Sequence, residues 1–331
     1  MKTLVHMTFA FTAGVVVVFI IHAYLFLTTP IAPEMPLQIE ITPGQSAREI
    51  SRLLEHEGIV TDAPMFMALT LASSKYRFLK AGTYVFEGGH LPMEIMEILF
   101  RGKTLRYRIT IPEGSTIYTI ADIITNTGLV TREEFVQSAL SAETSSFFDL
   151  GAPSVEGFLF PDTYFLSPHM TPLEIMAKMI NRFSELYTHD FDVRAEELDM
   201  SRIEVLTLAS IIEKEAVVHE EKPIISSVFH NRLRKNMPLQ ADPTVVYGID
   251  GFSRTIRPED LLRDSPYNTY RIRGLPPGPI CNPSIASIRA ALWPASTDYL
   301  YFVSNRDGTH SFSTSLKEHN RVIRRLYRIR D

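Results

Sequence analysis

Two glutamates inside a long apolar run are the residues best placed to carry acid–base chemistry. The run Leu206–Val218 is apolar at most positions, so we expect its helix to be buried in a core. Carboxylates are rare in such helices unless they are paired or functional. Glu213 and Glu215 both interrupt this run. At about 100° per residue, Glu213 shares its face with Leu206, Ala209, Ser210, Ala216 and Val217.

Several of those neighbours are small, which leaves room for a ligand over the Glu213 carboxylate. A carboxyl group in an apolar recess has a raised pKa and can hold a proton near neutral pH. The pattern therefore predicts a raised pKa and a general-acid role for Glu213. Glu215 points the other way, with His219 one turn further along. Spacing alone leaves open that both are satisfied structural carboxylates.

Composition narrows the class of protein. A chain of 331 residues has room for about two domains and a leader, and its net charge of −5 is not typical of a nucleic-acid-binding protein. The single cysteine, Cys281, excludes an internal disulfide and a cysteine-based metal site. The sequence has no HExxH, GxSxG, P-loop or GxGxxG motif, so we expect neither a metal nor a cofactor.

The N-terminus predicts a membrane anchor at residues 1–30. Thr3–Pro33 contains no Asp, Glu, Lys or Arg, and Leu4–Leu27 is long enough to cross a bilayer. Lys2 precedes this span and the next basic residue is Arg48, which favours a cytoplasmic N-terminus. A cleaved signal peptide is the alternative, and the length of the apolar run argues against it. A proline-rich linker follows at residues 31–37.

An internal repeat predicts two β-α-α-β-α units, at residues 38–108 and 109–185. Ile41-Thr-Pro-Gly44 returns seventy residues later as Ile111-Pro-Glu-Gly114, and Gly58-Ile-Val-Thr61 returns as Gly128-Leu-Val-Thr131. The second unit carries ten extra residues around 147–157. Residues 186–331 then form a mixed α/β domain around the Glu213 helix. The predicted fold class is α+β.

Four later segments carry local predictions. Glu156–Tyr164, dense in aromatic and acidic residues, is expected near the working cleft. Asp242–Gly248 reads as a two-turn helix with Asp242 as its N-cap, and Asn282-Pro283 should cap a helix that runs through residue 292. Asn305–Gly308 predicts a hairpin turn.

Five segments occur in the order found in a known family. They are Leu208-Ala-Ser-Ile-Ile-Glu213-Lys-Glu215, Val228-Phe-His-Asn-Arg-Leu233, Leu239-Gln-Ala-Asp-Pro-Thr-Val-Val-Tyr-Gly248, Tyr267-Asn-Thr-Tyr270 and Gly274-Leu-Pro-Pro-Gly-Pro-Ile280. Together they resemble the YceG-like endolytic murein transglycosylases. The resemblance covers nearly the whole chain, including the anchor and a LysM-like region at residues 38–108.

This resemblance implies a single-pass protein of the inner membrane with a periplasmic catalytic domain at residues 186–331. Its expected reaction is non-hydrolytic cleavage of the MurNAc–GlcNAc bond within peptidoglycan strands, leaving 1,6-anhydro-MurNAc ends and terminating glycan elongation. Penicillin-binding synthases are the expected protein partners. By the resemblance Glu213 is catalytic. The chain departs from the family at Ser284, where glycine is expected, and at Cys281; neither is expected to touch the acid.

A lytic transglycosylase needs only one carboxyl group, because the C6 hydroxyl of the muramic acid replaces water as the nucleophile. Glu213 would protonate the leaving oxygen and then take the hydroxyl proton. The candidate substrate-binding residues are Glu215, Asn231, Gln240, Asp242, Tyr247, Asn268 and Tyr270. Two alternatives stay open: an anchored peptidoglycan-binding scaffold for synthases, and a muramidase whose second carboxylate is Asp242 or Glu156.

Overall fold

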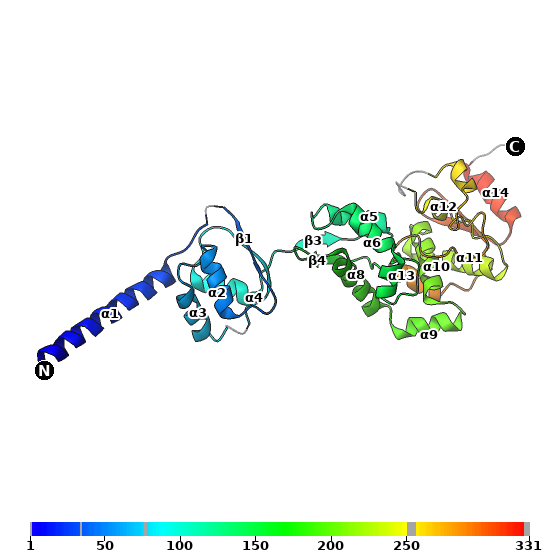
Figure 1. The fold of residues 1–331 in the computed structure, drawn as a ribbon. Coiled ribbons are helices and arrows are strands. Elements are labelled where there is room, and N and C mark those ends of the chain that lie inside the picture. Colours follow the sequence, from blue (N-terminus) through cyan, green and yellow to red (C-terminus); the bar gives the residue numbers. More distant parts are fainter. Residues whose placement is uncertain (1, 34, 76–77, 250–255, 328–331) are drawn as a thin grey trace. The chain divides into compact units, whose positions relative to one another are not determined.

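A computed structural model describes residues 2–33, 35–75, 78–249 and 256–327, with the elements labelled in Figure 1. The chain forms two compact units, residues 1–107 and 108–331. The boundaries predicted between the linker, the repeats and the catalytic domain stay predictions.

The first unit begins with the apolar helix α1 (Lys2–Thr28). Within the described residues, His6–Thr28 is the one segment long and apolar enough to cross a membrane, with a mean hydropathy of 2.3. Most of its side chains are exposed. Burying such a surface in lipid is favourable, so the helix is suited to an anchor.

The rest of the first unit packs helices against a two-stranded sheet. Its elements are β1 (Leu37–Ile41), α2 (Ala47–His56), α3 (Ala63–Ala72), β2 (Gly82–Phe86) and α4 (Pro92–Arg101). The strands pair antiparallel, from Leu37 opposite Phe86 to Ile41 opposite Gly82. Apolar side chains from both strands and the three helices form one core, which includes Leu54 and Phe66. The observed order is the predicted β-α-α-β-α.

The second unit opens with the same order and one addition. Its first elements are β3 (Tyr107–Thr110), α5 (Ile117–Thr125), α6 (Arg132–Leu140), α7 (Ala142–Phe147), β4 (Thr163–Leu166) and α8 (Pro172–Leu186). Strands β3 and β4 pair in a second two-stranded sheet. Helix α7 is the extra element, and it lies just before the predicted insertion. A likeness of either copy to LysM stays a prediction.

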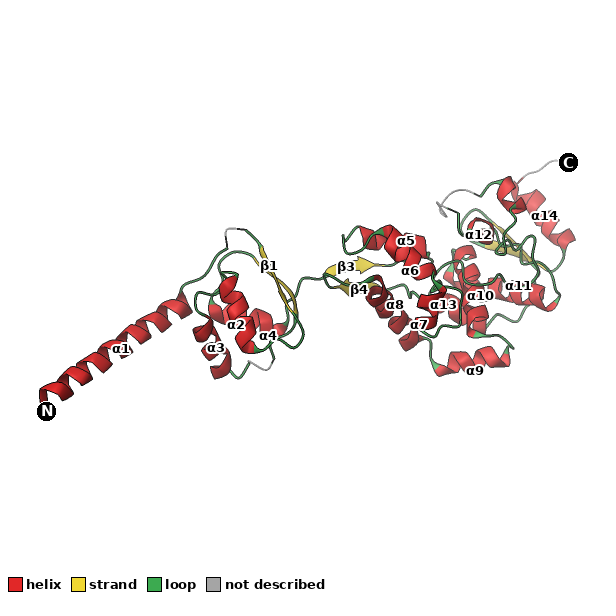
Figure 2. Ribbon diagram, in the orientation of Figure 1, coloured by secondary structure: helices red, strands yellow, loops and turns green. Residues whose placement is uncertain are grey.

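The remaining residues are mainly helical, as Figure 2 shows. The elements are α9 (His189–Glu197), α10 (Arg202–Glu215), η1 (His219–Glu221), α11 (Lys222–Arg234), α12 (Pro243–Val246), η2 (Pro258–Leu262), α13 (Ile285–Leu292), β5 (Tyr301–Ser304), β6 (His310–Ser313) and α14 (Leu316–Tyr327). Helix α10 is the centre of this part: Val205–Ile212 is buried without a break. It packs against α11 and α13. Strands β5 and β6 form the predicted hairpin, with Ser304 opposite His310.

Three predicted details of these helices are wrong. Helix α10 ends at Glu215 because Ala216 is extended, so Ala216 and Val217 do not share a helical face with Glu213. Helix α12 has four residues, about one turn instead of two; Asp242 is its N-cap residue as predicted, but the Asp242 side chain makes no capping hydrogen bond. The cap of α13 is Ser284, whose hydroxyl accepts a hydrogen bond from the Ser287 amide, and not Asn282-Pro283.

A buried polar cluster joins the β3–β4 part of the second unit to its later loops. The Glu156 carboxylate is 1% exposed and accepts hydrogen bonds from the Ile117 amide (3.1 Å), the Tyr247 hydroxyl (3.1 Å) and the Asn282 side chain (2.7 Å). The Asn282 side-chain oxygen accepts from the Gly157 and Leu159 amides, at 2.8 and 2.9 Å. Segments more than a hundred residues apart therefore meet at one carboxyl group. Burial raises the pKa of Glu156 to about 8.

Substitution of Glu156 by Gln should flatten the pH dependence of stability. The pKa of this carboxyl group rises from 4.5 to about 8 on folding, so between these pH values the folded protein holds a proton that the unfolded chain has lost. The contribution of Glu156 to the free energy of unfolding is therefore fully present below pH 4.5 and is lost as the pH rises to about 8. We expect the free energy of unfolding of the unmutated chain to fall by roughly 2–4 kcal/mol more than that of Glu156→Gln between pH 5 and 8. Denaturant unfolding of the full chain in detergent measures it. The exposed Glu143→Gln is the control, and parallel curves for all three proteins would contradict the assignment.

Candidate functional site

A pocket of about 420 Å³ lies at the C-terminal end of α10. We call it the acid pocket. One wall comes from α10, α11 and the loops after them, and the other from the β5–β6 hairpin and α14. The lining residues are Glu215, Arg232, Gln240, Asp242, Tyr270, Tyr301, Phe302, Val303, Ser304, His310, Leu316 and His319. Carboxylate, amide, hydroxyl and aromatic groups in one cavity suit a ligand with many hydroxyls and apolar ring faces, such as a glycan.

Glu215 is the last residue of α10 and its carboxyl group faces this pocket. Burial raises its pKa to about 8, and the neighbouring Asp242 carboxylate acts in the same direction. The Asp242 main-chain amide and the Arg232 guanidinium oppose the shift but do not cancel it. The Glu215 carboxyl therefore holds a proton at neutral pH, which is the state a general acid requires.

Asp242, Tyr270 and Gln240 form the polar floor beside this acid. The Tyr270 hydroxyl donates a hydrogen bond to the Asp242 carboxylate. Gln240 has a left-handed backbone with φ of +49°, which is unfavourable for a residue other than glycine. The Gln240 amide donates to the Thr269 carbonyl at 3.1 Å, and the next amide donates to the Thr269 hydroxyl at 2.9 Å. These bonds hold the loop in the strained conformation that turns it at the pocket.

Arg232 connects the two walls. Its side chain is buried and donates to the Leu300 carbonyl at 2.7 Å and to the Leu239 carbonyl at 2.6 Å. Leu300 immediately precedes the hairpin and Leu239 precedes Gln240. One guanidinium group thereby sets the spacing between the hairpin and the polar floor.

The hairpin wall holds residues that sequence reasoning missed. Tyr301 and His319 stack with ring centres 5.3 Å apart, and Phe302 packs edge-on against His310 at 5.4 Å. The predicted hairpin already placed these aromatic residues near one another. No sequence signal linked the hairpin to Glu215, because their contact depends on how α11 and α14 pack.

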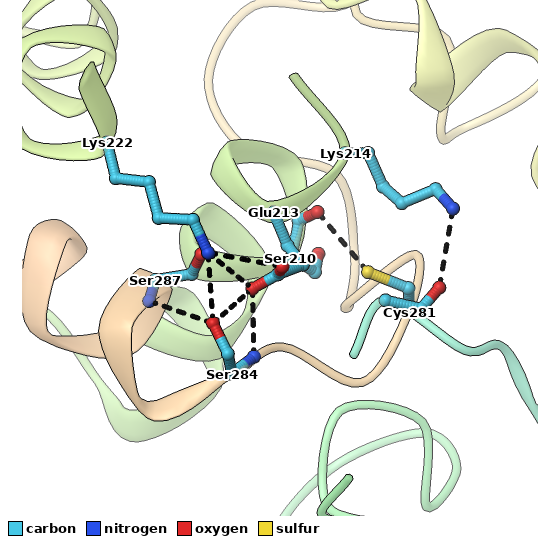
Figure 3. Close-up of polar contacts among 8 residues, drawn as sticks. Ser210, Glu213, Lys214, Lys222, Cys281, Ser284 and Ser287 are labelled. Atoms are coloured by element: carbon cyan, nitrogen blue, oxygen red, sulfur yellow. Dashed lines mark hydrogen bonds and ion pairs between the residues drawn. The ribbon is translucent and has the colours of Figure 1, made fainter. Parts of the chain in front are cut away.

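Glu213 lies in a different environment, shown in Figure 3. Its carboxylate contacts the Lys222 ammonium at 3.2 Å and accepts hydrogen bonds from the Ser284 amide (2.9 Å) and hydroxyl (2.5 Å). The Glu213 and Lys222 side chains are only 8% and 6% exposed. Burial acts to raise the pKa of Glu213, but the hydrogen bonds from Ser284 and the charge of Lys222 outweigh it and hold that pKa below its ordinary value. The prediction of a raised pKa for Glu213 is therefore wrong.

The expectation that Ser284 does not touch the acid is also wrong. Its hydroxyl and its amide both donate to Glu213, and the same residue caps α13. Cys281 is buried, and its thiol contacts the Ser210 carbonyl at 3.4 Å, one helical turn before Glu213. The space predicted over Glu213 is thus filled by the chain itself.

The other predicted residues divide into two groups. Glu215, Gln240, Asp242 and Tyr270 line the acid pocket. Asn231 and Asn268 instead use their side-chain amides to hold main-chain carbonyls. Tyr247 donates to the buried Glu156 carboxylate, which itself lies outside the pocket.

No group of three His, Cys, Asp or Glu side chains within the described ranges could hold a metal ion.

Breaking the Glu213–Lys222 pair should destabilise the second unit. In Glu213→Gln the Lys222 charge stays buried without its partner, which typically costs about 3–5 kcal/mol. Because the pKa of Glu213 is lowered on folding, its contribution is present above pH 4.5 and is lost as the pH falls through the folded value. We expect a lower melting temperature for Glu213→Gln at pH 7 and a smaller difference near pH 3. The exposed Glu220→Gln is the matched control, and an unchanged melting temperature for Glu213→Gln at pH 7 would contradict this role.

Comparisons with known proteins agree across most of the chain. The model of the YceG-like family matches residues 39–325. A protein of Bacillus subtilis (strain 168) named endolytic murein transglycosylase is 33% identical over 302 residues, which cover 86% of this chain and 83% of that protein. A second protein of that name, from Streptococcus pneumoniae serotype 2, is 29% identical and is covered over 57% of its length.

A solved structure is also similar. The crystal structure of a YceG-like protein from Listeria monocytogenes matches with a TM-score of 0.61 and 32% identity. The match covers 88% of this chain and 100% of that one. The family match extends over both repeats, the acid pocket and most of α14, and the chain therefore belongs to the YceG-like family.

Proposed function

We propose that this chain is an endolytic lytic transglycosylase that cleaves the MurNAc–GlcNAc bond within peptidoglycan strands. The observation that carries the proposal is a carboxyl group with a pKa of about 8 in a pocket lined by amide, hydroxyl and aromatic side chains. The names of the relatives support the same activity. The expected products are strands that end in 1,6-anhydro-MurNAc.

We assign the proton donor to Glu215 and not to Glu213, which the family resemblance suggested. Glu215 lines the pocket and holds a proton at neutral pH. Glu213 does not line that pocket, and its lowered pKa keeps it ionised against Lys222. An ionised, ion-paired carboxylate has no proton to give. The assignment of Glu213 remains the rival prediction, and paired variants separate the two.

In this mechanism the Glu215 carboxyl protonates the glycosidic oxygen as its bond to C1 breaks. The C6 hydroxyl of the same muramic acid then bonds to C1, so no water is consumed. The Asp242 carboxylate lies where it can stabilise positive charge that develops at C1. Gln240 and Tyr270 supply amide and hydroxyl groups for the sugar hydroxyls, and Tyr301 and Phe302 add apolar surface to the pocket wall.

A second candidate reaction is hydrolysis. Asp242 shares the pocket with Glu215, and a pair of carboxyl groups is the usual equipment of a glycosidase that uses water. Glu156 is excluded from this role because it is buried outside the pocket. The products differ: hydrolysis leaves reducing ends, and lytic cleavage leaves anhydro ends that are lighter by one water. A peptidoglycan-binding scaffold would release neither.

The decisive comparison is Glu215→Gln against Glu213→Gln on purified sacculi. Glu215→Gln cannot donate a proton, so we expect strand cleavage to fall at least about 100-fold with the melting temperature retained. Glu213→Gln should lose stability, and at a temperature where it is folded it should keep more activity than Glu215→Gln. Mass spectrometry of the released fragments measures the rate and identifies the ends. The reverse order of activities would return the assignment to Glu213. Reducing ends from the unmutated chain would establish hydrolysis, and the absence of fragments would favour the scaffold.

We further propose that α1 anchors the protein in the inner membrane with its N-terminus in the cytoplasm. The length and hydropathy of His6–Thr28 support the anchor, and the position of Lys2 supports the orientation. An anchored enzyme of this kind would cut strands close to the membrane and so terminate their elongation. Penicillin-binding synthases are the expected partners.

The orientation has a direct test. A reporter that is active only outside the cytoplasm, fused after Asp331, should be active in cells. Inversion of the flanking charge, by Lys2→Glu together with added lysines after residue 30, should lower that activity. An inactive fusion, together with activity of a second reporter that works only in the cytoplasm and is fused at the same position, would overturn the orientation and with it access to the substrate.

A further inference from the structure

Intramolecular attack by the C6 hydroxyl requires a group that takes its proton, and Glu215 is protonated when the reaction starts. We propose that His310, oriented by Glu221, is the base that takes this proton; the inference rests on the proposed lytic activity. In the simpler scheme, one carboxyl group first donates a proton to the leaving oxygen and then takes the proton of the hydroxyl. In the scheme proposed here, Glu215 donates the first proton and His310 takes the second.

The Glu221 carboxylate fixes the His310 ring by two contacts. One oxygen accepts a hydrogen bond from the His310 main-chain amide at 3.0 Å, and the other contacts Nδ1 at 2.7 Å. The His310 and Glu221 side chains are 8% and 13% exposed. An ionised carboxylate can only accept hydrogen bonds, so the proton of the neutral ring is on Nδ1. Nε2 is then left with a free lone pair, the arrangement that a base requires.

The His310 ring faces the acid pocket. It is one of the residues that line the pocket, and edge-on packing against Phe302 restricts its rotation. Among the residues that the structure describes, none hydrogen-bonds to Nε2 of His310. His319 lines the same pocket, but its Nδ1 is buried without a partner. His310 is therefore the imidazole whose basic nitrogen is open to a ligand.

Chain geometry holds this dyad next to the acid. Glu221 ends η1, six residues after Glu215, and His310 begins β6. The hairpin turn lies against the segment between them: a Cβ added at Gly308, where φ is +92°, would be 3.5 Å from a Val217 methyl group. Glu215 and His310 thus reach one pocket from segments whose adjoining loops lie against each other.

The proposed step forms one bond, breaks one bond and moves two protons. The C1–O bond to the leaving sugar breaks, and its oxygen takes the Glu215 proton. O6 forms a bond to C1, and the O6 proton passes to Nε2 of His310. The resulting imidazolium faces the Glu221 carboxylate, which stabilises it. Transfer of one proton from His310 to Glu215 through solvent restores both residues, and no water is consumed.

Other charged and titratable groups lie near His310. Glu215, Arg232, Asp242 and His319 line the same pocket, and Asp307 in the hairpin turn interacts electrostatically with His310. The test therefore compares kcat between matched variants and does not depend on the pH at which any one group ionises.

The experiment uses the full chain in detergent with purified glycan strands, and the principal variant is His310→Asn. The asparagine amide can occupy the place of Nδ1 and keep the Glu221 contact, but it has no base at Nε2. We expect kcat to fall about 100-fold or more, with KM changed less than threefold and the melting temperature retained. The fall in kcat above pH 8, caused by ionisation of Glu215, should remain in this variant.

Two further variants complete the design. Glu221→Gln should lower kcat about tenfold without a change in KM, because the imidazole keeps its basic nitrogen but loses orientation and charge stabilisation. The exposed His219→Gln, in the same short helix as Glu221, should match the unmutated chain. If His310→Asn does not fold, His310→Gln is measured in the same way.

Full kcat in a folded His310 variant would overturn the inference, as would a loss of activity that comes from KM and not from kcat. Either result, obtained while the unmutated chain still forms anhydro ends, leaves the proposed activity intact. Reducing ends from the unmutated chain would instead overturn the proposed activity itself.

Discussion

The buried ion pair between Glu213 and Lys222 is the interaction on which the site geometry depends. Its carboxylate belongs to α10, its ammonium begins α11, and the two donors of Ser284 begin α13. Three helices therefore converge on one carboxylate near the end of α10. A pair this deeply buried tolerates little movement, since separation would leave a charge without a partner in an apolar surrounding. The position of Glu215, two residues later, follows from this constraint.

The two glutamates illustrate how strongly the surroundings determine a carboxyl group. They are separated by a single lysine, so the helix directs them about 200° apart. Both lose hydration on folding, which raises the pKa of each. Around Glu213 the Lys222 cation and the two donors of Ser284 more than compensate. Around Glu215 the charge of the Asp242 carboxylate adds to the shift, so the pKa of one carboxyl group is lowered and that of the other is raised.

The acid pocket is assembled from segments that are distant in the sequence. Arg232 joins the loop before Gln240 to the start of the hairpin, and Glu221 joins the segment after α10 to the hairpin at His310. Each link is a charged group bound to main-chain or side-chain partners on another element. Such links set distances more closely than apolar contacts do, because their geometry is directional. The pocket thereby keeps an acid and an imidazole on facing walls.

Much of the architecture was determined by the sequence alone. The apolar span, the duplicated order of strands and helices, the hairpin turn and the importance of the Leu206–Glu215 region all depend on local pattern: hydrophobic length, periodicity and glycine placement. Four of the predicted site residues, among them Glu215 and Asp242, also lie in the pocket. These features can be predicted without knowing which other residues pack against them.

Tertiary structure decided which glutamate is buried against a cation and which faces the pocket. Helical spacing predicts the direction in which a side chain points from the helix axis, but it does not predict which residues contact that side chain. Ser284, Lys222 and the hairpin residues reach α10 from elsewhere in the chain. The roles of Glu213, Asn231 and Asn268, and the pairing of His310 with Glu221, are set by those long-range contacts. A pKa depends on the charges and donors within a few ångströms, and in this protein most of them are brought there only by folding.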